Sequence, residues 1–169
     1  RGRTSSELLP RVLRRAALLV LVGILLQSFP WIAARPDGVP FERLLTVRLP
    51  GVLQRIGLCY GAAALLFLFA NERTQRRVLW LLLLGYWPLL ALTPTPDGGA
   101  PDLATQGDHL AAWLDRTLFG SHMYRASDGG VYDPEGLLST LPAIATALLG
   151  VSCGRVLAGD GSLPDKVAT

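Results

Sequence analysis

Two carboxylates, Asp133 and Glu135, are separated by a single residue at the start of an apolar run that extends to Cys153. Ionisable groups at a membrane boundary are costly, and proteins keep them there for ion paths, substrate contacts or proton transfer. The plain alternative is a solvated turn, because Asp-Pro and Glu-Gly are ordinary turn dipeptides.

A second polar group lies where another apolar segment begins. Arg48, Gln54 and Arg55 surround Pro50, which favours the first turn of a helix. The free N–H groups and dipole of a helix N-terminus favour anions, so this group suits a phosphate, a carboxylate or an internal acid. The alternative is that both arginines are interfacial anchors. Because an unpaired cation inside a membrane is costly, we expect Arg55 to pair with a carboxylate or a ligand anion.

Histidine and cysteine are scarce, with two of each in the chain. His122 and His109 lie between the apolar segments, where a histidine is more often a surface residue; an acyl transfer to an amine nevertheless needs a group that handles protons near neutral pH. We keep His122 as a candidate binding residue. Cys59 and Cys153 fall inside apolar runs, which predicts two buried thiols and neither a disulfide nor a metal site.

The bulk composition indicates that a membrane positions these groups. Half of the residues are hydrophobic and 17% are charged, whereas a soluble domain carries about a quarter charged residues. Four segments approach the ~20 apolar residues needed to cross a bilayer. We predict a single all-α membrane domain over 1–169, with spanning helices at about 12–31, 51–70, 78–92 and 137–157 and an outer loop at 93–136.

The outer loop should contain structure of its own. Residues 108–120 have the apolar spacing of an amphipathic helix lying on the membrane or over the bundle, with Asp108 as N-cap and Gly120 as the C-terminal stop. In the fourth predicted span, Pro142 should break the helix, and Gly150 with Gly154 indicates a close helix contact.

The arginines flank the apolar runs and form no single stripe, which favours orientation in a lipid bilayer over binding to nucleic acid. Ten cations fall on one side of the predicted topology and six on the other, and seven acids lie between 93 and 136. Positive-inside reasoning places both chain ends in the cytoplasm. The ten cations are Arg1, Arg3, Arg11, Arg14, Arg15, Arg73, Arg76, Arg77, Arg155 and Lys166.

Three blocks of sequence together resemble one family. They are 47–57 (VRLPGVLQRIG), 110–116 (LAAWLDR) followed by His122-Met123-Tyr124, and 132–142 (YDPEGLLSTLP). In this order they resemble the heparan-alpha-glucosaminide N-acetyltransferases and their bacterial relatives, over roughly residues 43–157. The combination is specific, whereas any single block is weak.

The resemblance implies a polytopic enzyme that transfers acetyl from acetyl-CoA to the amine of a glucosamine-type sugar across the membrane. It places Arg48, Gln54 and Arg55 near an anionic part of the donor, and Asp133 and Glu135 toward the sugar. The family's acetyl-accepting histidine lies in an earlier outer loop, so no catalytic residue is assigned here. Where the family usually has asparagine before the second block, this chain has His109.

The resemblance further implies an internal fragment of a larger protein in the bacterial inner membrane. It would pack against the parent's remaining helices, and a homo-oligomer is a further expectation. Such a fragment alone should be inactive. Two other readings stay open: a transporter or non-enzymatic membrane protein for a sugar-like solute, and a structural piece whose charges only pair internally. An outer-loop histidine upstream of Arg1 would favour the enzyme.

Overall fold

The computed structural model describes residues 4–33, 46–105, 107–124 and 132–159, and within these ranges every regular element is helical. The all-α prediction is confirmed. The elements are α1 (Ser5–Ala33), α3 (Val52–Phe69), α4 (Glu72–Leu92), α5 (Leu110–Phe119), the short 3₁₀ helix η1 (Gly120–His122) and α6 (Thr140–Ala158).

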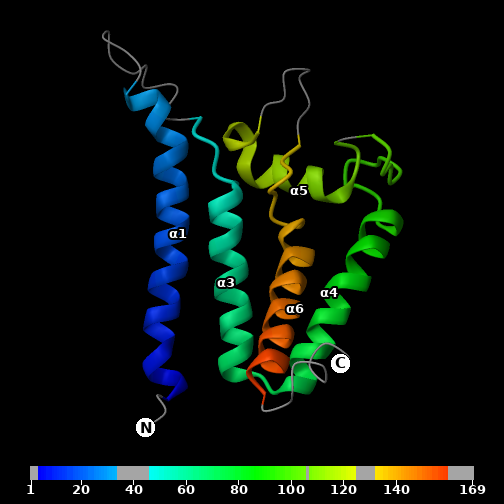
Figure 1. Cartoon of the computed structure of the whole chain (residues 1–169). Coiled ribbons are helices and arrows are strands. Elements are labelled where there is room, and N and C mark those ends of the chain that lie inside the picture. The colour runs from blue at the N-terminus through cyan, green and yellow to red at the C-terminus, as the bar shows by residue number, and fades with distance from the viewer. Residues whose placement is uncertain (1–3, 34–45, 106, 125–131, 160–169) are drawn as a thin grey trace.

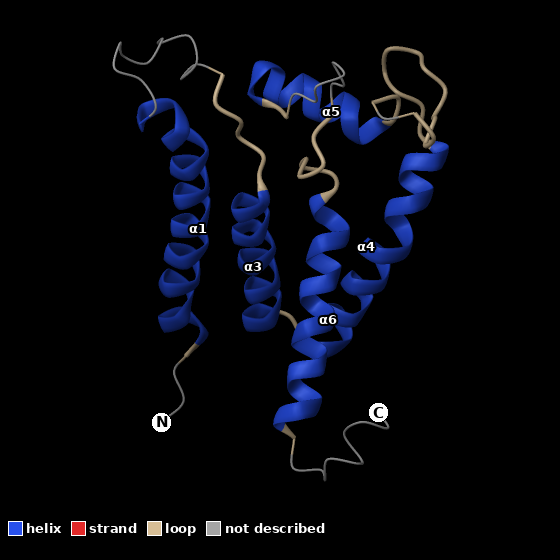
Figure 2. Cartoon of the chain, turned by 45° about the horizontal axis from the view of Figure 1, so that its top comes forward, coloured by secondary structure: helices blue, strands red, loops and turns tan. Residues whose placement is uncertain are grey.

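Four long helices run alongside one another, and α5 lies across one end of them (Figure 1). Helix α1 packs on α3, α3 on α6, and α6 on α4, so the last helix of the chain lies between α3 and α4 (Figure 2). We call the end that holds α5 and residues 46–51 and 132–139 the loop end. The opposite end, with the α3–α4 connection and the last turns of α6, is the link end.

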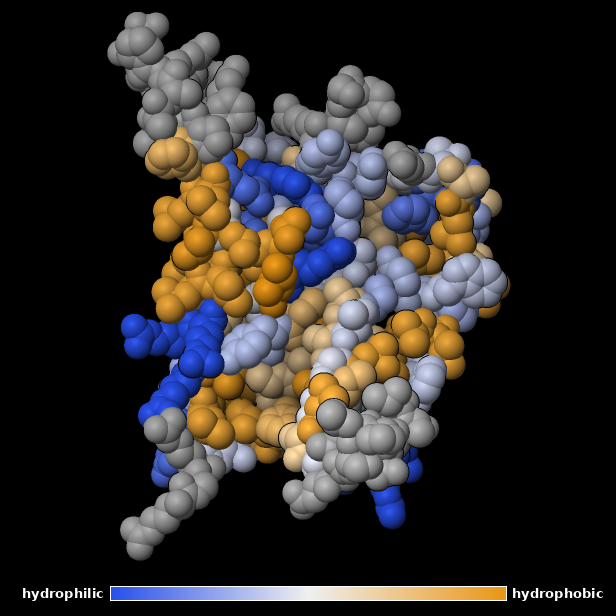
Figure 3. Space-filling view, viewed as in Figure 1, coloured by the Kyte–Doolittle hydropathy of each residue, from blue (hydrophilic) through white to orange (hydrophobic). Residues whose placement is uncertain are grey.

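Within the described ranges, three helices are long and apolar enough to cross a membrane: Ser5–Phe29, Val52–Phe69 and Thr140–Ala158. Helix α4 begins six residues before the predicted third span, and Glu72 and three arginines occupy its first turns, so four spans is an approximate count. Leu25 of α1 and Leu84 of α4 are each 64% exposed, as expected of side chains that face lipid. Figure 3 shows apolar side chains over much of α1.

The helix ends follow from local capping. Asn71 accepts a hydrogen bond from the Thr74 N–H at 2.9 Å and starts α4. Gly120, with a φ of 51°, ends α5 as predicted, because glycine adopts positive φ without steric cost. His109, rather than the predicted Asp108, caps α5: its Nδ1 accepts from the Ala112 N–H at 3.2 Å.

The predicted break at Pro142 is wrong. Helix α6 begins at Thr140 instead of 137, so Pro142 lies in its first turn, where an N–H has no intrahelical partner to lose. Pro88 lies in the interior of α4.

Small residues bring α1 and α3 together. A Cβ at Gly57 would lie 2.9 Å from the Ala16 carbonyl oxygen, which no real Cβ tolerates. The contact predicted at Gly150 and Gly154 is not found, since a Cβ at either would meet nothing within 4 Å in the described structure.

The buried core of the other three helices centres on Ala63 of α3, Leu79 of α4 and Leu148 of α6. Cys59 is buried as predicted, whereas Cys153 is exposed because it lies on a face of α6 that no described helix covers. Both thiols are free.

Candidate functional site at the loop end

The first two sequence blocks meet through one main-chain hydrogen bond and one from a side chain to the main chain. The Leu49 N–H donates to the His122 carbonyl at 2.9 Å, and the His122 Nδ1–H donates to the Val47 carbonyl at 2.8 Å. His122 is half-buried. Its observed role is to hold residues 47–49 against the end of η1, which places the neighbouring Arg48 side chain over the loop end.

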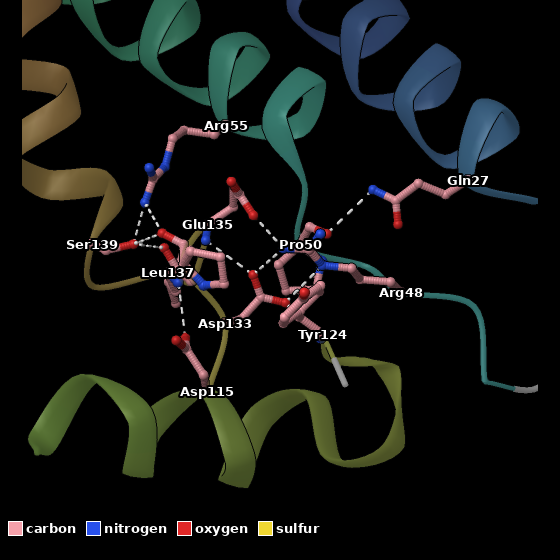
Figure 4. A network of polar contacts seen from close by, with 12 residues as sticks. Gln27, Arg48, Pro50, Arg55, Asp115, Tyr124, Asp133, Glu135, Leu137 and Ser139 are labelled. Atoms are coloured by element: carbon pink, nitrogen blue, oxygen red, sulfur yellow. Dashed lines mark hydrogen bonds and ion pairs between the residues drawn. The ribbon is translucent and has the colours of Figure 1, made fainter. Parts of the chain in front are cut away.

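The first and third blocks meet through an ion-pair cluster (Figure 4). Arg48 donates from Nε to Asp133 Oδ2 at 2.9 Å and from Nη2 to Asp133 Oδ1 at 2.5 Å, a bidentate geometry. Its Nη2 also donates to Glu135 Oε2. The guanidinium lies over the Tyr124 ring, 5.0 Å from its centroid. One arginine therefore holds two carboxylates that are 85 and 87 residues away in sequence.

Asp133 is fully committed to this cluster. Its side chain is 0% exposed, and its two oxygens also accept from the Tyr124 N–H at 2.9 Å and the Glu135 N–H at 3.0 Å. A buried carboxylate is tolerated when its lone pairs are satisfied in this way. Burial lowers the pKa of Arg48, but the bonds and charges of Asp133 and Glu135 outweigh that effect and leave it raised.

Arg55 contacts uncharged oxygens. It is the fourth residue of α3, and its Nη2 donates to the Pro134 carbonyl at 2.7 Å and to Ser139 Oγ. Its Nε is buried and has no partner among the described residues. In that part of the chain Arg55 pairs with no carboxylate, so the expected internal ion pair is not found. The guanidinium is instead directed into the loop that precedes α6.

The second and third blocks meet at Asp115, a residue that the sequence interpretation missed. Asp115 is 1% exposed, and its Oδ1 accepts from the Leu137 N–H at 2.9 Å. A Cβ at Gly136 would clash with the same carboxylate, so glycine is needed there. Burial, with the nearby Asp133 charge, raises the pKa of Asp115 to about 6, against the lowering effects of the Leu137 N–H and Arg55.

A cavity of about 740 Å³ opens beside the cluster, between α1, α3 and the segment after η1. Arg48 and Gln54 line it together with Gln27 of α1 and Tyr124. Gln54 is 5% exposed, and neither its Oε1 nor its Nε2 has a partner within the described ranges. Gln27 is the second residue that the sequence interpretation missed, although a lone amide inside an apolar run was a visible signal.

A second, mostly apolar groove of about 910 Å³ lies between α3 and α6. Arg55 lines it near the loop end and Arg155 near the link end. No cluster of three or more metal-ligating side chains occurs in the described part of the chain.

The structure thus brings the sequence-predicted residues to one end of the bundle. Arg48, Asp133 and Glu135 bond directly, His122 holds the backbone beside Arg48, and Arg55 bonds to the carbonyl between the two acids. Gln54 joins Arg48 only through the shared cavity. Their roles toward a ligand remain a proposal.

The fold and its apolar helices define the class: an all-helical integral membrane protein. Comparison with curated proteins makes the relationship specific. The chain is 32% identical to heparan-alpha-glucosaminide N-acetyltransferase from Homo sapiens and 31% identical to that from Mus musculus, in each case over 93% of its own length. It spans 29% of the length of each relative. The resemblance seen in the three blocks is confirmed, and the chain is related to this family of membrane acetyltransferases. No family model matches the chain.

Proposed function

We propose that the full-length protein is a membrane acetyltransferase that uses acetyl-CoA to acetylate the amine of a glucosamine-type sugar. The observation that carries this proposal is the meeting of all three sequence blocks in one polar cluster around Arg48 and Asp133. The names of the two relatives support N-acetyl transfer to a glucosaminide. The present chain would supply one wall of the site.

In this proposal the two acids have different roles. Asp133 is buried and saturated, so it positions Arg48 and the surrounding main chain. Glu135 is 18% exposed in its side chain, and within the described residues only its Oε2 is engaged, by Arg48. Glu135 is therefore the carboxylate that attracts and orients an incoming ammonium.

The two arginines also differ. The charge of Arg48 is balanced by two carboxylates. Among the described residues, Arg55 bonds only to uncharged oxygens, and it lines the groove between α3 and α6. Of the two, Arg55 is better suited to an anionic part of acetyl-CoA.

The proposed reaction forms a C–N bond and breaks a C–S bond. The ammonium first gives one proton to solvent. The neutral amine nitrogen then takes the acetyl group and loses a second proton as the amide forms, and this proton balances the charge of the CoA thiolate that leaves. We assign neither the acetyl-carrying nucleophile nor the base to this chain. We further propose that the link end faces the cytoplasm and the loop end the opposite side of a bacterial inner membrane, because ten of sixteen cations lie toward the link end in the predicted topology.

The test uses the full-length protein in liposomes with isotope-labelled acetyl-CoA and glucosamine. Wild type should produce N-acetylglucosamine, and Glu135→Gln, which keeps the shape and removes the charge, should lower the rate at least tenfold. Glu72→Gln is the matched control, since Glu72 lies at the link end and is 67% exposed in its side chain. Full activity of Glu135→Gln would contradict the assigned role. Glucosamine uptake without acetylation would favour a transporter.

A further inference from the structure

Two glutamine side chains lie together at the loop end of the contact between α1 and α3. Gln27 Nε2 donates to the Pro50 carbonyl at 3.3 Å, and its Oε1 is buried without a partner in the described structure (Figure 4). Gln54, across the contact, has both amide atoms buried and unpartnered there. Buried amide groups are normally hydrogen-bonded, so three such atoms in one place require an explanation.

Glycines make room for these amides. A Cβ at Gly51 would clash with Gln27 Nε2 and lie 2.7 Å from Gln54 Oε1, and a Cβ at Gly23 would lie 2.8 Å from the Gln54 amide carbon. The absence of two Cβ atoms lets both amides reach the same point between the helices. Both helices therefore contribute to the position of the two amides.

The same glutamines line the 740 Å³ cavity. Leu26, Val52, Leu53 and Met123 give it an apolar surface, and Thr46, Arg48 and Tyr124 complete the lining with Gly23. A concave apolar wall with a few converging polar groups is the usual form of a small-molecule site. Asp133 and Glu135 bond to Arg48 from outside this lining.

We infer that Gln27 and Gln54 bind the acetamido group of an N-acetylated hexosamine in this cavity. A carboxamide presents one donor and one acceptor side by side, which matches the C=O and N–H of a secondary amide. An ammonium would meet no carboxylate in the lining, and burying it there without a counter-charge is costly. The site therefore selects the acetylated sugar over the free amine.

The identity of the sugar rests on the proposed function. In that setting, substrate and product are bound by neighbouring groups. Glu135 attracts the acceptor as an ammonium, and the glutamines bind the neutral amide that the reaction makes. The cavity would then be a product or acetylated-sugar subsite, which predicts product inhibition that depends on Gln54.

The experiment measures binding of N-acetylglucosamine, glucosamine and glucose to the full-length protein in nanodiscs by calorimetry, without acetyl-CoA. N-acetylglucosamine should bind at least tenfold more tightly than glucosamine. Gln54→Leu and Gln27→Leu should each weaken that binding at least tenfold. Gln54→Glu supplies a carboxylate of the same length and should shift the preference toward glucosamine.

The matched control is Gln75→Leu. Gln75 is also 5% exposed, but it lies at the link end and its amide is bonded to Leu66, Ala70 and Arg155. This variant should leave sugar affinity unchanged. Equal affinity for the three sugars, or N-acetylglucosamine binding that survives both leucine variants, would overturn the inference.

The outcomes also separate this site from the proposed enzyme. If sugar binding depends on Gln54 but the protein shows no acetyl transfer, the sugar site is supported and the proposed enzymatic function is contradicted. If the protein transfers acetyl but its product inhibition is unchanged by substitution of Gln54, the enzymatic function is supported and the sugar site is contradicted.

Discussion

The two ends of the bundle contain the same residue types and use them differently. At the link end, Gln75 Nε2 donates to the Leu66 and Ala70 carbonyls at 3.0 and 2.7 Å, and its Oε1 accepts from Arg155 Nη2 at 2.6 Å. At the loop end, Gln54 is equally buried and bonds to none of the described residues. The link end thus uses its polar side chains to join α3, α4 and α6, whereas the loop end leaves buried amide atoms without a partner among the described residues.

The arginines repeat the contrast. Arg155 bonds to a neutral amide, lies over the Phe67 ring and approaches the exposed Glu72 only to 3.8 Å. Arg48 compensates a carboxylate that is completely buried. Since a buried charge without its partner is far more costly than a lost neutral hydrogen bond, the loop end should be the more sensitive to mutation.

The largest effect is expected at Arg48. Arg48→Met leaves the Asp133 carboxylate buried and unpaired and should cost about 3–5 kcal/mol of stability, measured by thermal unfolding in detergent. Arg155→Met, its counterpart at the link end, should cost only about 1 kcal/mol. Adding Asp133→Leu to Arg48→Met should recover much of the loss. Equal losses of stability in Arg48→Met and Arg155→Met would contradict the expectation that the loop end is more sensitive to mutation than the link end.

A pH dependence should arise from Asp115. Because burial raises its pKa from 3.8 to about 6, the folded state binds this proton more tightly than the unfolded state. Its contribution to stability is therefore complete at acid pH and is lost as pH rises from about 4 to 6, by roughly 2–3 kcal/mol.

Asp115→Asn removes this titration and keeps an oxygen for the Leu137 N–H. The variant should unfold at a higher temperature than wild type at pH 7.5, with a smaller difference at pH 4.5. A difference that does not change between these pH values would show that Asp115 does not titrate in this range.

Replacing the two buried glutamines, Gln75 and Gln54, should change stability by amounts that differ in sign as well as in size. Gln75→Leu removes satisfied hydrogen bonds and strands Arg155, so it should destabilise by about 1–3 kcal/mol. Gln54→Leu removes amide atoms that bond to nothing described, and stability should stay unchanged or rise. Thermal unfolding of the two variants without sugar gives the comparison. Similar destabilisation by both would make Gln54 a structural residue.

The smallest effect concerns the cap of α5. Burial, aided by the charge of Arg116, lowers the pKa of His109, so the imidazole is neutral at pH 7 and its Nδ1 can accept from the Ala112 N–H. His109→Asn should preserve this bond through the amide oxygen, whereas His109→Leu should cost about 1 kcal/mol. Unfolding at pH 7 compares the two, and equal loss would rule out the capping role.

The sequence predicted the helices well because hydropathy and caps act locally. It marked Arg48 and Asp133 as unusual but could not pair them, since the two are 85 residues apart and nothing local records the contact. Gln27 could have been identified locally, because it is a lone amide in an apolar run. Asp115 is one of seven acids in its loop, and only the packing of α5 separates it from the others.

The start of α6 shows why element boundaries are harder to predict. Asp115 holds the Leu137 N–H, and Ser139 and Thr140 donate to the Gly136 carbonyl at 2.9 and 3.0 Å. These tertiary and turn contacts keep residues 136–139 out of the helix, although their apolar composition favours it. The predicted break at Pro142 failed for the same reason, because the helix begins later than composition indicates.

The position of α6 between α3 and α4 has a consequence for how the protein is made. Helices α3 and α4 leave the ribosome before α6, against which both of them pack. Arg48 must wait for Asp133, which at about 5–20 residues per second emerges on the order of ten seconds later. During that interval α3 can pack on α1, whereas α4 still lacks its contact with α6. Insertion of α6 therefore joins α3 and α4 through a shared partner, and the segment that precedes it supplies the carboxylate that Arg48 binds.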